Sequence, residues 1–155
     1  MPQKSPRILV LNGPNLNMLG KREPEIYGSA TLEDLRTLCE SEGEKLGLSI
    51  DFRQTNHEGE LIEWIQQTRH DAEGGGADGI VLNAAALTHT SVGLYDALMA
   101  AQTPMVEVHL SNIHAREAFR AHSYVSRAAL GVLCGFGPVG YAFALKALSD
   151  HLETR

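Results

Sequence analysis

The segment GIVLNAAALTHTSVGLYDALMAAQTPMVEVHL, residues 79–110, contains the pattern that decides the fold. It opens with a short apolar run at 79–83, continues with helical spacing at 90–102, and returns to an apolar run at 105–110. Two strands that are apolar on both faces and joined by a helix favour a parallel sheet, because a parallel crossover is long and right-handed. The segment therefore predicts one strand–helix–strand unit of an α/β protein.

The same alternation extends along the rest of the chain. Further strands are predicted at 7–11, 49–54 and 129–134, and further helices at 32–46, 58–72 and 139–152. Thr31 and Asp34 form a variant capping box at the start of the 32–46 helix. Together these elements predict a flavodoxin-like five-stranded parallel sheet with helices on both faces, built as a single domain over residues 1–155.

Length and composition limit the class of protein. A chain of 155 residues, 43% hydrophobic and 21% charged, is typical of a globular domain whose core needs no disulfide or metal. The formal net charge of -6 argues against general nucleic-acid binding, so any anion site must be local. Cys39 and Cys134 are interpreted as buried, inert thiols in a reducing compartment.

Two stretches share some features of targeting or membrane segments. The apolar run that follows MPQKSPR is far shorter than the apolar region of a signal peptide, so we expect a cytoplasmic protein. Residues 128–145 carry no charge, but several glycines and Pro138 interrupt them. We predict a short buried strand there, then a glycine turn and a final helix, rather than a membrane span.

Polar residues follow four of the predicted strands. They occupy residues 12–17, 56–58, 83–90 and 111–114. In open parallel sheets, ligands bind beyond the carboxyl ends of the strands, near the point where strand order reverses. The sequence therefore predicts that these four loops converge on one site.

The sequence disfavours two common kinds of site, one for a dinucleotide and one for zinc. Residues 135–140, GFGPVG, match the dinucleotide-binding pattern, but only 15 residues follow them, too few for a second strand and a ribose-binding acid. His109, His114 and His122 lack the spacing of a helical zinc site, so structural or hydrogen-bonded histidines are the preferred interpretation. We therefore expect neither a bound cofactor nor a metal.

Glu107 and His109 are two residues apart on a predicted strand, so their side chains point to the same face near its carboxyl end. A carboxylate beside an imidazole stabilises the protonated ring, which would equip His109 as a general acid. A purely structural ion pair is the alternative that spacing alone leaves open.

Residues 16–28 form a polar excursion that resembles a lid and contains Lys21, Arg22 and Tyr27. A tyrosine can act as a base near neutral pH only if its pKa is lowered well below about 10, and a neighbouring Arg22 could do this. The alternative is a solvated loop in which Tyr27 only packs.

Arg116 and Arg120 have the spacing of one helix face, where they would form either a small-carboxylate site or a solvated surface.

Seven ordered motifs, taken together, are far more specific than any of them alone. They are NGPNLN at 12–17, REP at 22–24, YG at 27–28, NHEGEL at 56–61, THTS at 88–91, EVH at 107–109 and SNIHARE at 111–117. In this combination the chain closely resembles the type II 3-dehydroquinate dehydratases, from about residue 8 to residue 148.

This resemblance implies a fold, an activity and an assembly. It implies a flavodoxin-like subunit, usually assembled as a homododecamer made of four trimers. The implied reaction converts 3-dehydroquinate to 3-dehydroshikimate and water through an enolate, without cofactor, metal or covalent intermediate. It serves the shikimate pathway or quinate breakdown. The alternatives are a flavodoxin-like protein that holds a phosphate-bearing cofactor at Gly13 or Gly137, and a non-catalytic homologue.

The resemblance also assigns roles by position. Tyr27 is implied as the base that removes the proton next to the ketone, and Arg22 as the cation that keeps it ionised. Asn15 is implied to position a water that stabilises the enolate. His109, oriented by Glu107, is implied to protonate the departing hydroxyl. These residues supply the base, the oxyanion stabiliser and the acid that such an elimination needs.

Six further positions are implied in substrate binding. They are Asn83, His89 and Arg120 for the ring hydroxyls, Leu110 and Ser111 for the carboxylate, and Asp96 for the site of a neighbouring subunit. Backbone amides beyond a strand end suit a carboxylate. Two stretches depart from the family pattern: Ala84-Ala85-Ala86-Leu87 replaces a turn that usually contains Gly or Pro, and Tyr95 replaces a basic residue.

Overall fold

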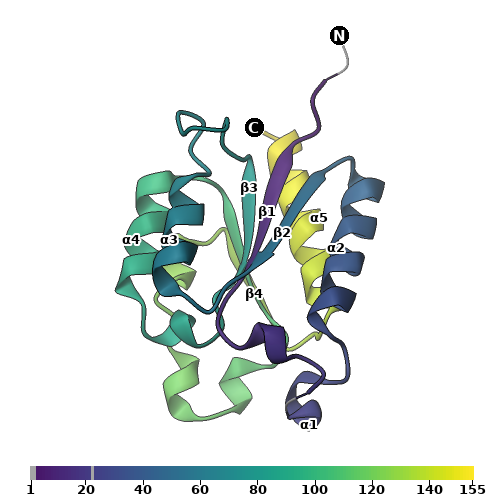
Figure 1. The fold of residues 1–155 in the computed structure, drawn as a ribbon, viewed down its shortest axis with the longest axis vertical. Helices are drawn as coiled ribbons and strands as arrows, with labels where there is room; N and C mark the ends of the chain where they lie inside the picture. The colour runs from purple at the N-terminus through teal and green to yellow at the C-terminus, as the bar shows by residue number, and fades with distance from the viewer. Residues whose placement is uncertain (1–2, 22) are drawn as a thin grey trace.

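The computed structural model describes residues 3–21 and 23–155, which include a five-stranded parallel sheet. The strand order is β2-β1-β3-β4-β5, as the flavodoxin-like prediction requires (Figure 1). The strands are β1 (Arg7–Asn12), β2 (Ser49–Gln54), β3 (Gly79–Asn83), β4 (Met105–His109) and β5 (Gly131–Cys134). Strand order reverses between β1 and β3, so the carboxyl ends of these two strands mark the place where a ligand site is expected.

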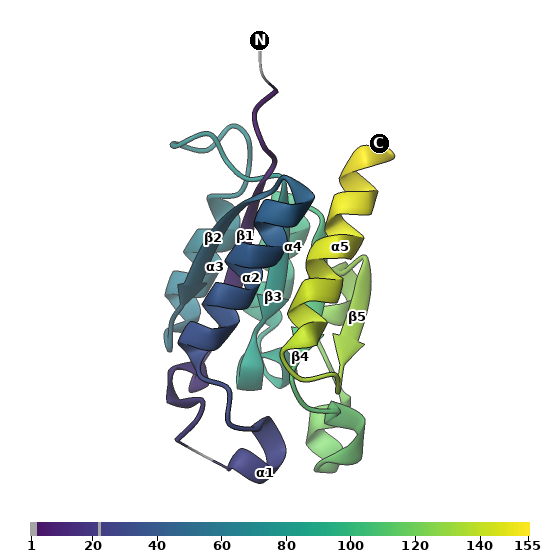
Figure 2. The same cartoon turned by 90° about the vertical axis from the view of Figure 1, so that its right-hand side faces the viewer.

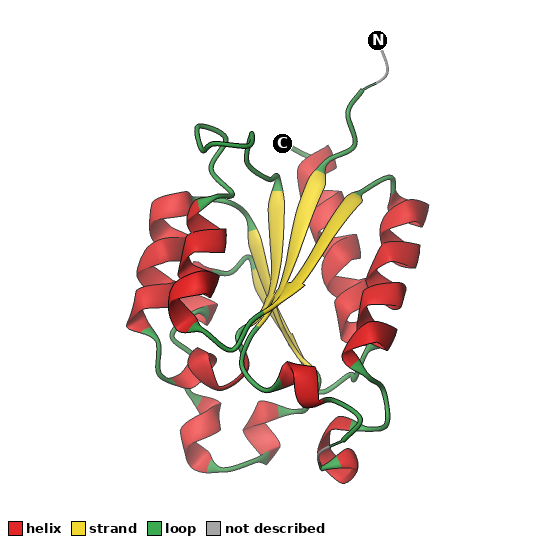
Figure 3. Cartoon of the chain, viewed as in Figure 1, coloured by secondary structure: helices red, strands yellow, loops and turns green. Residues whose placement is uncertain are grey.

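Four long helices cover the sheet in pairs, one pair on each face (Figures 2 and 3). The pair on one face is α2 (Leu32–Leu46) and α5 (Val139–Glu153), and the pair on the other face is α3 (Glu58–Gln66) and α4 (Val92–Ala101). Each face has its own hydrophobic core, because side chains alternate along a strand. On β1, Ile8 and Val10 belong to the α2/α5 core, whereas Leu9 and Leu11 belong to the α3/α4 core.

The start of α2 matches the prediction, but the end of α3 does not. Thr31 accepts the Asp34 N–H and Asp34 accepts the Thr31 N–H, which completes the expected capping box. The helix predicted over 58–72 begins where expected but is shorter, because α3 ends at Gln66. Just beyond this end, the buried Thr68 hydroxyl donates to the Ile65 carbonyl at 2.6 Å and contacts the Thr103 hydroxyl at 2.8 Å. A side chain bonded back to the last turn competes with further helix.

The last strand is shorter and more exposed than predicted. It begins at Gly131 rather than at residue 129, and Val132 within it is 42% exposed. The prediction of a buried strand is wrong here, because β5 lies at the edge of the sheet and pairs only with β4. The turn and helix expected after it are present, since α5 begins at Val139. No helix among the described residues is long and apolar enough to cross a membrane.

Short helices occupy the loops beyond the carboxyl ends of the strands, at the lower end of Figure 1. The excursion at 16–28 contains a 3-10 turn, Leu16–Met18, and the four-residue helix α1 (Pro24–Tyr27), neither of which was predicted. The other 3-10 turns are Ala85–His89, Ile113–Ala115, Ala118–Ala121 and Ser126–Ala128. The loops at this end of the sheet are therefore compactly folded.

Candidate active site

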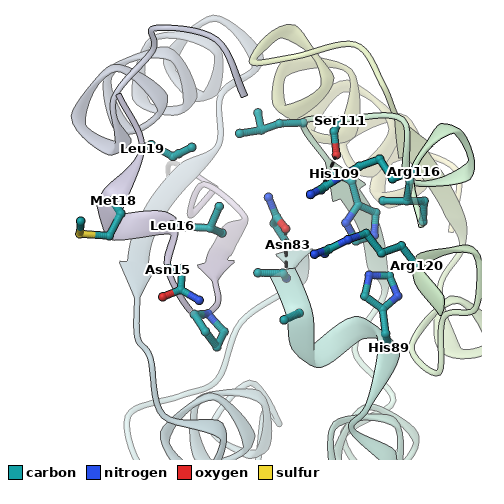
Figure 4. Close-up of a pocket in the computed structure, with 15 residues that line it drawn as sticks. Asn15, Leu16, Met18, Leu19, Asn83, His89, His109, Ser111, Arg116 and Arg120 are labelled. Carbon is teal, nitrogen blue, oxygen red and sulfur yellow. Dashed lines mark hydrogen bonds between the residues drawn. The ribbon is translucent and has the colours of Figure 1, made fainter. Parts of the chain in front are cut away.

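A pocket lies at the carboxyl end of the sheet, between the loops that follow β1, β3 and β4 (Figure 4). The loop after β1 contributes Pro14, Asn15, Leu16, Met18 and Leu19, and β3 and its loop contribute Asn83, Ala85, Ala86 and His89. The end of β4 and the segment beyond it contribute His109, Leu110, Ser111, Ile113, Arg116 and Arg120. Polar and cationic groups thus face an apolar wall formed by the β1 loop.

The loop after β2 supports the pocket but does not line it, so the predicted convergence of four loops on one site is wrong in this respect. Asn15 has a left-handed backbone, with φ 69°, and its N–H donates to the Asn56 side-chain oxygen at 2.9 Å. The Gln54 amide donates to the same oxygen at 3.1 Å and to the Gly13 carbonyl at 3.2 Å. Residues 54–56 therefore hold the backbone that presents Asn15 to the pocket.

The loops after β1 and β3 are in direct contact. The Gly13 N–H donates to the Asn83 carbonyl at 2.8 Å. A Cβ atom at Gly13 would lie 2.5 Å from the Ala84 carbonyl oxygen, so only glycine fits this close approach. Ala85 takes a left-handed conformation, with φ 52°, which is unfavourable for alanine and lies within the stretch that departs from the family pattern.

A buried hydrogen-bond chain lies under the pocket and involves Tyr141 of α5. The Asn83 side-chain amide donates to the Tyr141 hydroxyl at 2.9 Å, and this hydroxyl donates to the Asn12 side-chain oxygen at 2.7 Å. Burial raises the pKa of Tyr141, which keeps the phenol protonated and able to donate. The Asn83 side-chain oxygen accepts the Ala85 N–H at 3.2 Å. The orientation of Asn83 is therefore fixed from both ends of its amide.

His109 and Glu107 form the side-chain pair that their spacing predicted. His109 Nε2 lies 2.5 Å from Glu107 Oε2, and the two side chains are 5% and 0% exposed. Burial alone would raise the pKa of Glu107, but hydrogen bonds from His109, Ser126 and Ser123 outweigh it and lower the pKa below its usual value. Glu107 is therefore an ionised carboxylate beneath an imidazole that reaches the pocket.

Arg116 and Arg120 both line the pocket, but not from one helix face as their spacing predicted. Arg116 follows one 3-10 turn with an extended backbone, and Arg120 lies in the next 3-10 turn. The Arg116 guanidinium donates to the Ser111 hydroxyl at 3.3 Å, and Arg120 Nε donates to Glu117 at 2.6 Å. The expected local concentration of positive charge is present in an otherwise acidic chain.

The structure brings most of the predicted site residues to this pocket. Asn15, Asn83, His89, His109, Leu110, Ser111 and Arg120 line it. Glu107 lies behind His109, while Asp96 is exposed on α4 and does not line the pocket. Arg22 lies outside the described residues, and of Tyr27 only the backbone, at the end of α1, is described.

Several contributing residues had no recognisable local signal. Tyr141 is far from the other site residues in sequence, and its position on a helix predicts only packing. Leu16 and Leu19 form the apolar wall and are three residues apart. The 3-10 turn Leu16–Met18 is too short to show helical periodicity, so this spacing gave no signal. Arg116 was predicted as part of a basic patch, but its place in the pocket depends on the turn after Ile113.

The glycine run at 135–140 has a structural role. The Gly135 and Gly137 N–H groups donate to the carbonyls of His109 and Leu110 at 3.3 and 3.0 Å, so this glycine run ties the end of β4 to α5. Within the described residues no three His, Cys, Asp or Glu side chains are placed to hold a metal ion. Burial raises the pKa of the Cys39 thiol to about 12, in line with the predicted buried, inert thiol, whereas Cys134 on the edge strand β5 is only partly buried, contrary to the prediction.

Comparison with known proteins identifies the family. The model of the family described as dehydroquinase class II matches residues 6–149. The chain is 57% identical over 146 residues to 3-dehydroquinate dehydratase 2 of Pseudomonas aeruginosa, covering 94% of this chain and 95% of that protein. It is 56% identical to the 3-dehydroquinate dehydratase of Thermus thermophilus, over the same shares of the two chains.

Solved structures agree with the sequence relatives. The type II dehydroquinase of Propionibacterium acnes superposes with a TM-score of 0.87 at 43% identity, over 96% of this chain and 99% of that one. The type II dehydroquinase of Butyrivibrio crossotus gives 0.89 at 38% identity, over 94% and 99%. An α/β sheet with a carboxylate–imidazole pair on β4, beside the strands where the order reverses, is typical of a ligand-binding or catalytic domain. Within that class, the chain belongs to the class II dehydroquinase family.

Proposed function

We propose that the protein is a dehydratase that converts 3-dehydroquinate to 3-dehydroshikimate and water. Family membership supports the activity, and the names of its relatives supply the substrate. The observation that carries the proposal is the buried His109–Glu107 pair at the edge of a pocket lined by two arginines. This arrangement suits acid catalysis on a small anionic, hydroxylated ring.

His109 is the general acid in this proposal. It gives a proton to the tertiary hydroxyl of the substrate, which leaves as water while the ring double bond forms. Glu107 stays ionised and accepts a hydrogen bond from His109 Nε2, which stabilises the imidazolium before the transfer. The enclosed position of the pair strengthens this interaction.

The proton next to the ketone is removed first, and Tyr27 is the proposed base, with Arg22 stabilising the tyrosinate. Their assignment rests on their positions in the REP and YG motifs. Tyr27 closes the four-residue helix α1, within the excursion 16–28 that we propose acts as a mobile lid. Asn15 positions a water on the enolate oxygen, and its left-handed backbone held by Asn56 supports this role.

The substrate carboxylate and hydroxyls have separate partners in the proposal. Ser111 and the backbone amides at Leu110 and Ser111 hold the carboxylate, since backbone amides beyond a strand end suit an anion. Asn83, His89 and Arg120 contact the ring hydroxyls. The His89 Nδ1–H donates to the His122 carbonyl at 2.7 Å, which leaves Nε2 of the ring for the substrate.

The exposed position of Asp96 on α4 supports a role outside its own pocket. We propose that Asp96 reaches the site of a neighbouring subunit within a homododecamer of four trimers.

The two free cysteines fit a reducing compartment, and we propose the cytoplasm as the location. The reaction serves either aromatic biosynthesis or quinate breakdown.

The direct test is ultraviolet absorbance on mixing the purified protein with 3-dehydroquinate, because the conjugated enone of the product absorbs where the substrate does not. We expect a rise in absorbance with the wild type that EDTA does not change. Tyr27→Phe should reduce turnover by about 100-fold or more, since proton transfer by a positioned side chain contributes roughly 10²–10⁴-fold. A correctly folded wild type without turnover would favour a non-catalytic homologue.

A further inference from the structure

Glu107 is surrounded by more hydrogen-bond donors than its partnership with His109 requires. Ser126 Oγ donates to Glu107 Oε1 at 2.6 Å, and Ser123 Oγ lies 3.2 Å from each of the two carboxylate oxygens. Both serines come from the segment that follows Arg120, not from β4. None of the roles proposed above uses these two residues.

The direction of each hydrogen bond follows from the chemistry of the groups. An ionised carboxylate only accepts, so each serine hydroxyl in contact with Glu107 must donate. The Ser123 oxygen accepts the Ser126 backbone N–H at 3.1 Å, which leaves its own proton for Glu107. With His109 Nε2 as the third donor, the carboxylate is held on both oxygens and cannot rotate without losing a buried bond.

This arrangement also determines the tautomer of His109. Three donors to one carboxylate favour its ionised form, so Nε2 of His109 carries the proton that faces Glu107. The other ring nitrogen, Nδ1, is then the one available for proton exchange in the pocket. A rotated or displaced Glu107 would change both the tilt of the imidazole and the tautomer it favours.

We propose that Ser123 and Ser126 are positioning residues for the dehydration, which fix the Glu107 carboxylate so that it aligns His109 for proton transfer. This inference rests on the proposed function, because the step that the two serines serve is the protonation of the leaving hydroxyl. Neither serine is among the residues that line the pocket, so their action on the reaction is through Glu107.

The same segment connects the acid pair with substrate binding. Arg120 lines the pocket, the His122 carbonyl accepts the His89 ring N–H at 2.7 Å, and the Tyr124 N–H donates to the Thr88 carbonyl at 2.9 Å. Ser123 and Ser126 lie within the same turn. Residues 120–126 therefore connect the loop after β3 with the Glu107 carboxylate. Ser123 and Ser126 are the residues of this segment that contact Glu107.

The test compares Ser123→Ala, Ser126→Ala and the double variant with the wild type in steady-state kinetics. We expect kcat to fall about 10-fold in each single variant and about 100-fold in the double variant, as small displacements of catalytic groups do, with KM within about twofold. Ser126→Thr retains the hydroxyl and should restore most of kcat. Ser149→Ala removes a buried serine of α5 away from the pocket and should leave kcat unchanged.

NMR of the His109 imidazole nitrogens provides a second readout that does not depend on turnover. We expect the wild type to carry its proton on Nε2 and the double variant to show a shifted or averaged signal. An unchanged kcat in the folded double variant, or an unchanged imidazole signal, would overturn the inference. A wild type without turnover would instead overturn the proposed function, while the imidazole signal would still report whether the serines position His109.

Discussion

The two walls of the pocket are held in place by different means. The β4 wall, Glu107 and His109, belongs to a fully buried strand and is fixed by side-chain hydrogen bonds to the charged Glu107 carboxylate. The β1 wall, residues 13–19, is held mainly through backbone hydrogen bonds to neighbouring loops, and the one from the left-handed Asn15 to Asn56 is exposed. Buried charged groups are expensive to disturb, whereas an exposed amide contact costs little. Substitutions should therefore have larger effects on the β4 wall.

The largest expected effect is the loss of the acid. His109→Ala removes the proposed proton donor and should lower kcat by about 10²–10⁴-fold. His114→Ala changes an exposed histidine of the same segment and is the matched control, with kcat expected within about twofold of the wild type. Full activity of the His109 variant would remove the distinction between the two walls.

Replacement of the buried carboxylate should affect stability in a pH-dependent way. The folded-state pKa of Glu107 is lowered from 4.5, so its stabilising effect is fully present above about this pH and is lost as pH falls through the lowered pKa. Glu107→Gln should cost about 1–3 kcal/mol of unfolding free energy at pH 7. Urea unfolding should show this difference shrinking below pH 4.5.

Glu40→Gln, an exposed change on α2, provides the comparison for this measurement. Its unfolding free energy should follow that of the wild type at each pH to within about 0.5 kcal/mol. A Glu107→Gln difference that stays constant down to about pH 3 would show that the ionised state of Glu107 does not stabilise the fold.

The β1 wall should respond more weakly. Asn56→Ala removes the oxygen that accepts the Asn15 N–H, and should reduce kcat/KM about 5–10-fold, equal to the roughly 1 kcal/mol of one hydrogen bond. Asn56→Asp keeps an acceptor at the same atom and should retain most of the activity. If Asn56→Ala lowers kcat/KM as far as His109→Ala does, the β1 wall is as sensitive as the β4 wall.

The smallest expected effect concerns backbone strain in the loop after β3. Ala85→Gly relieves an alanine with φ 52°, and after the entropic cost of glycine the unfolding free energy should rise by up to about 1 kcal/mol. Ala86→Gly, at the neighbouring exposed position without positive φ, should lower it by about 0.5–1 kcal/mol. Calorimetric melting of both variants measures whether the unfolding free energy rises or falls in each. An equal fall in the two variants would show that Ala85 is unstrained.

Local pattern was sufficient for the sheet and for the acid pair. The apolar runs of β1, β3 and β4 are visible because buried parallel strands are hydrophobic on both faces. Glu107 and His109 were paired because the side-chain period of a strand is two residues. The family resemblance, not the pattern, supplied the substrate and the roles of Asn15 and Tyr27.

Contacts between distant parts of the chain were not predictable in this way. The end of α3 involves Thr68 and Thr103, which are 35 residues apart. Arg116 and Arg120 have helical spacing, but the chain turns between them, so periodicity predicted the wrong surface for them. Ser126 reaches Glu107 across 19 residues, and no local rule connects a serine in a turn with a carboxylate in a strand.

The hydrogen bonds of Tyr141 have a consequence for biosynthesis of the protein. Asn12 and Asn83 belong to the first and third strands, but the hydroxyl that joins them comes from the last helix, 129 and 58 residues further along the chain. During translation, the first strands can form while α5 is still unmade, and their two buried amides then lack this shared partner. The pocket therefore reaches its final geometry only after the C-terminal helix has been synthesised and has packed on the sheet.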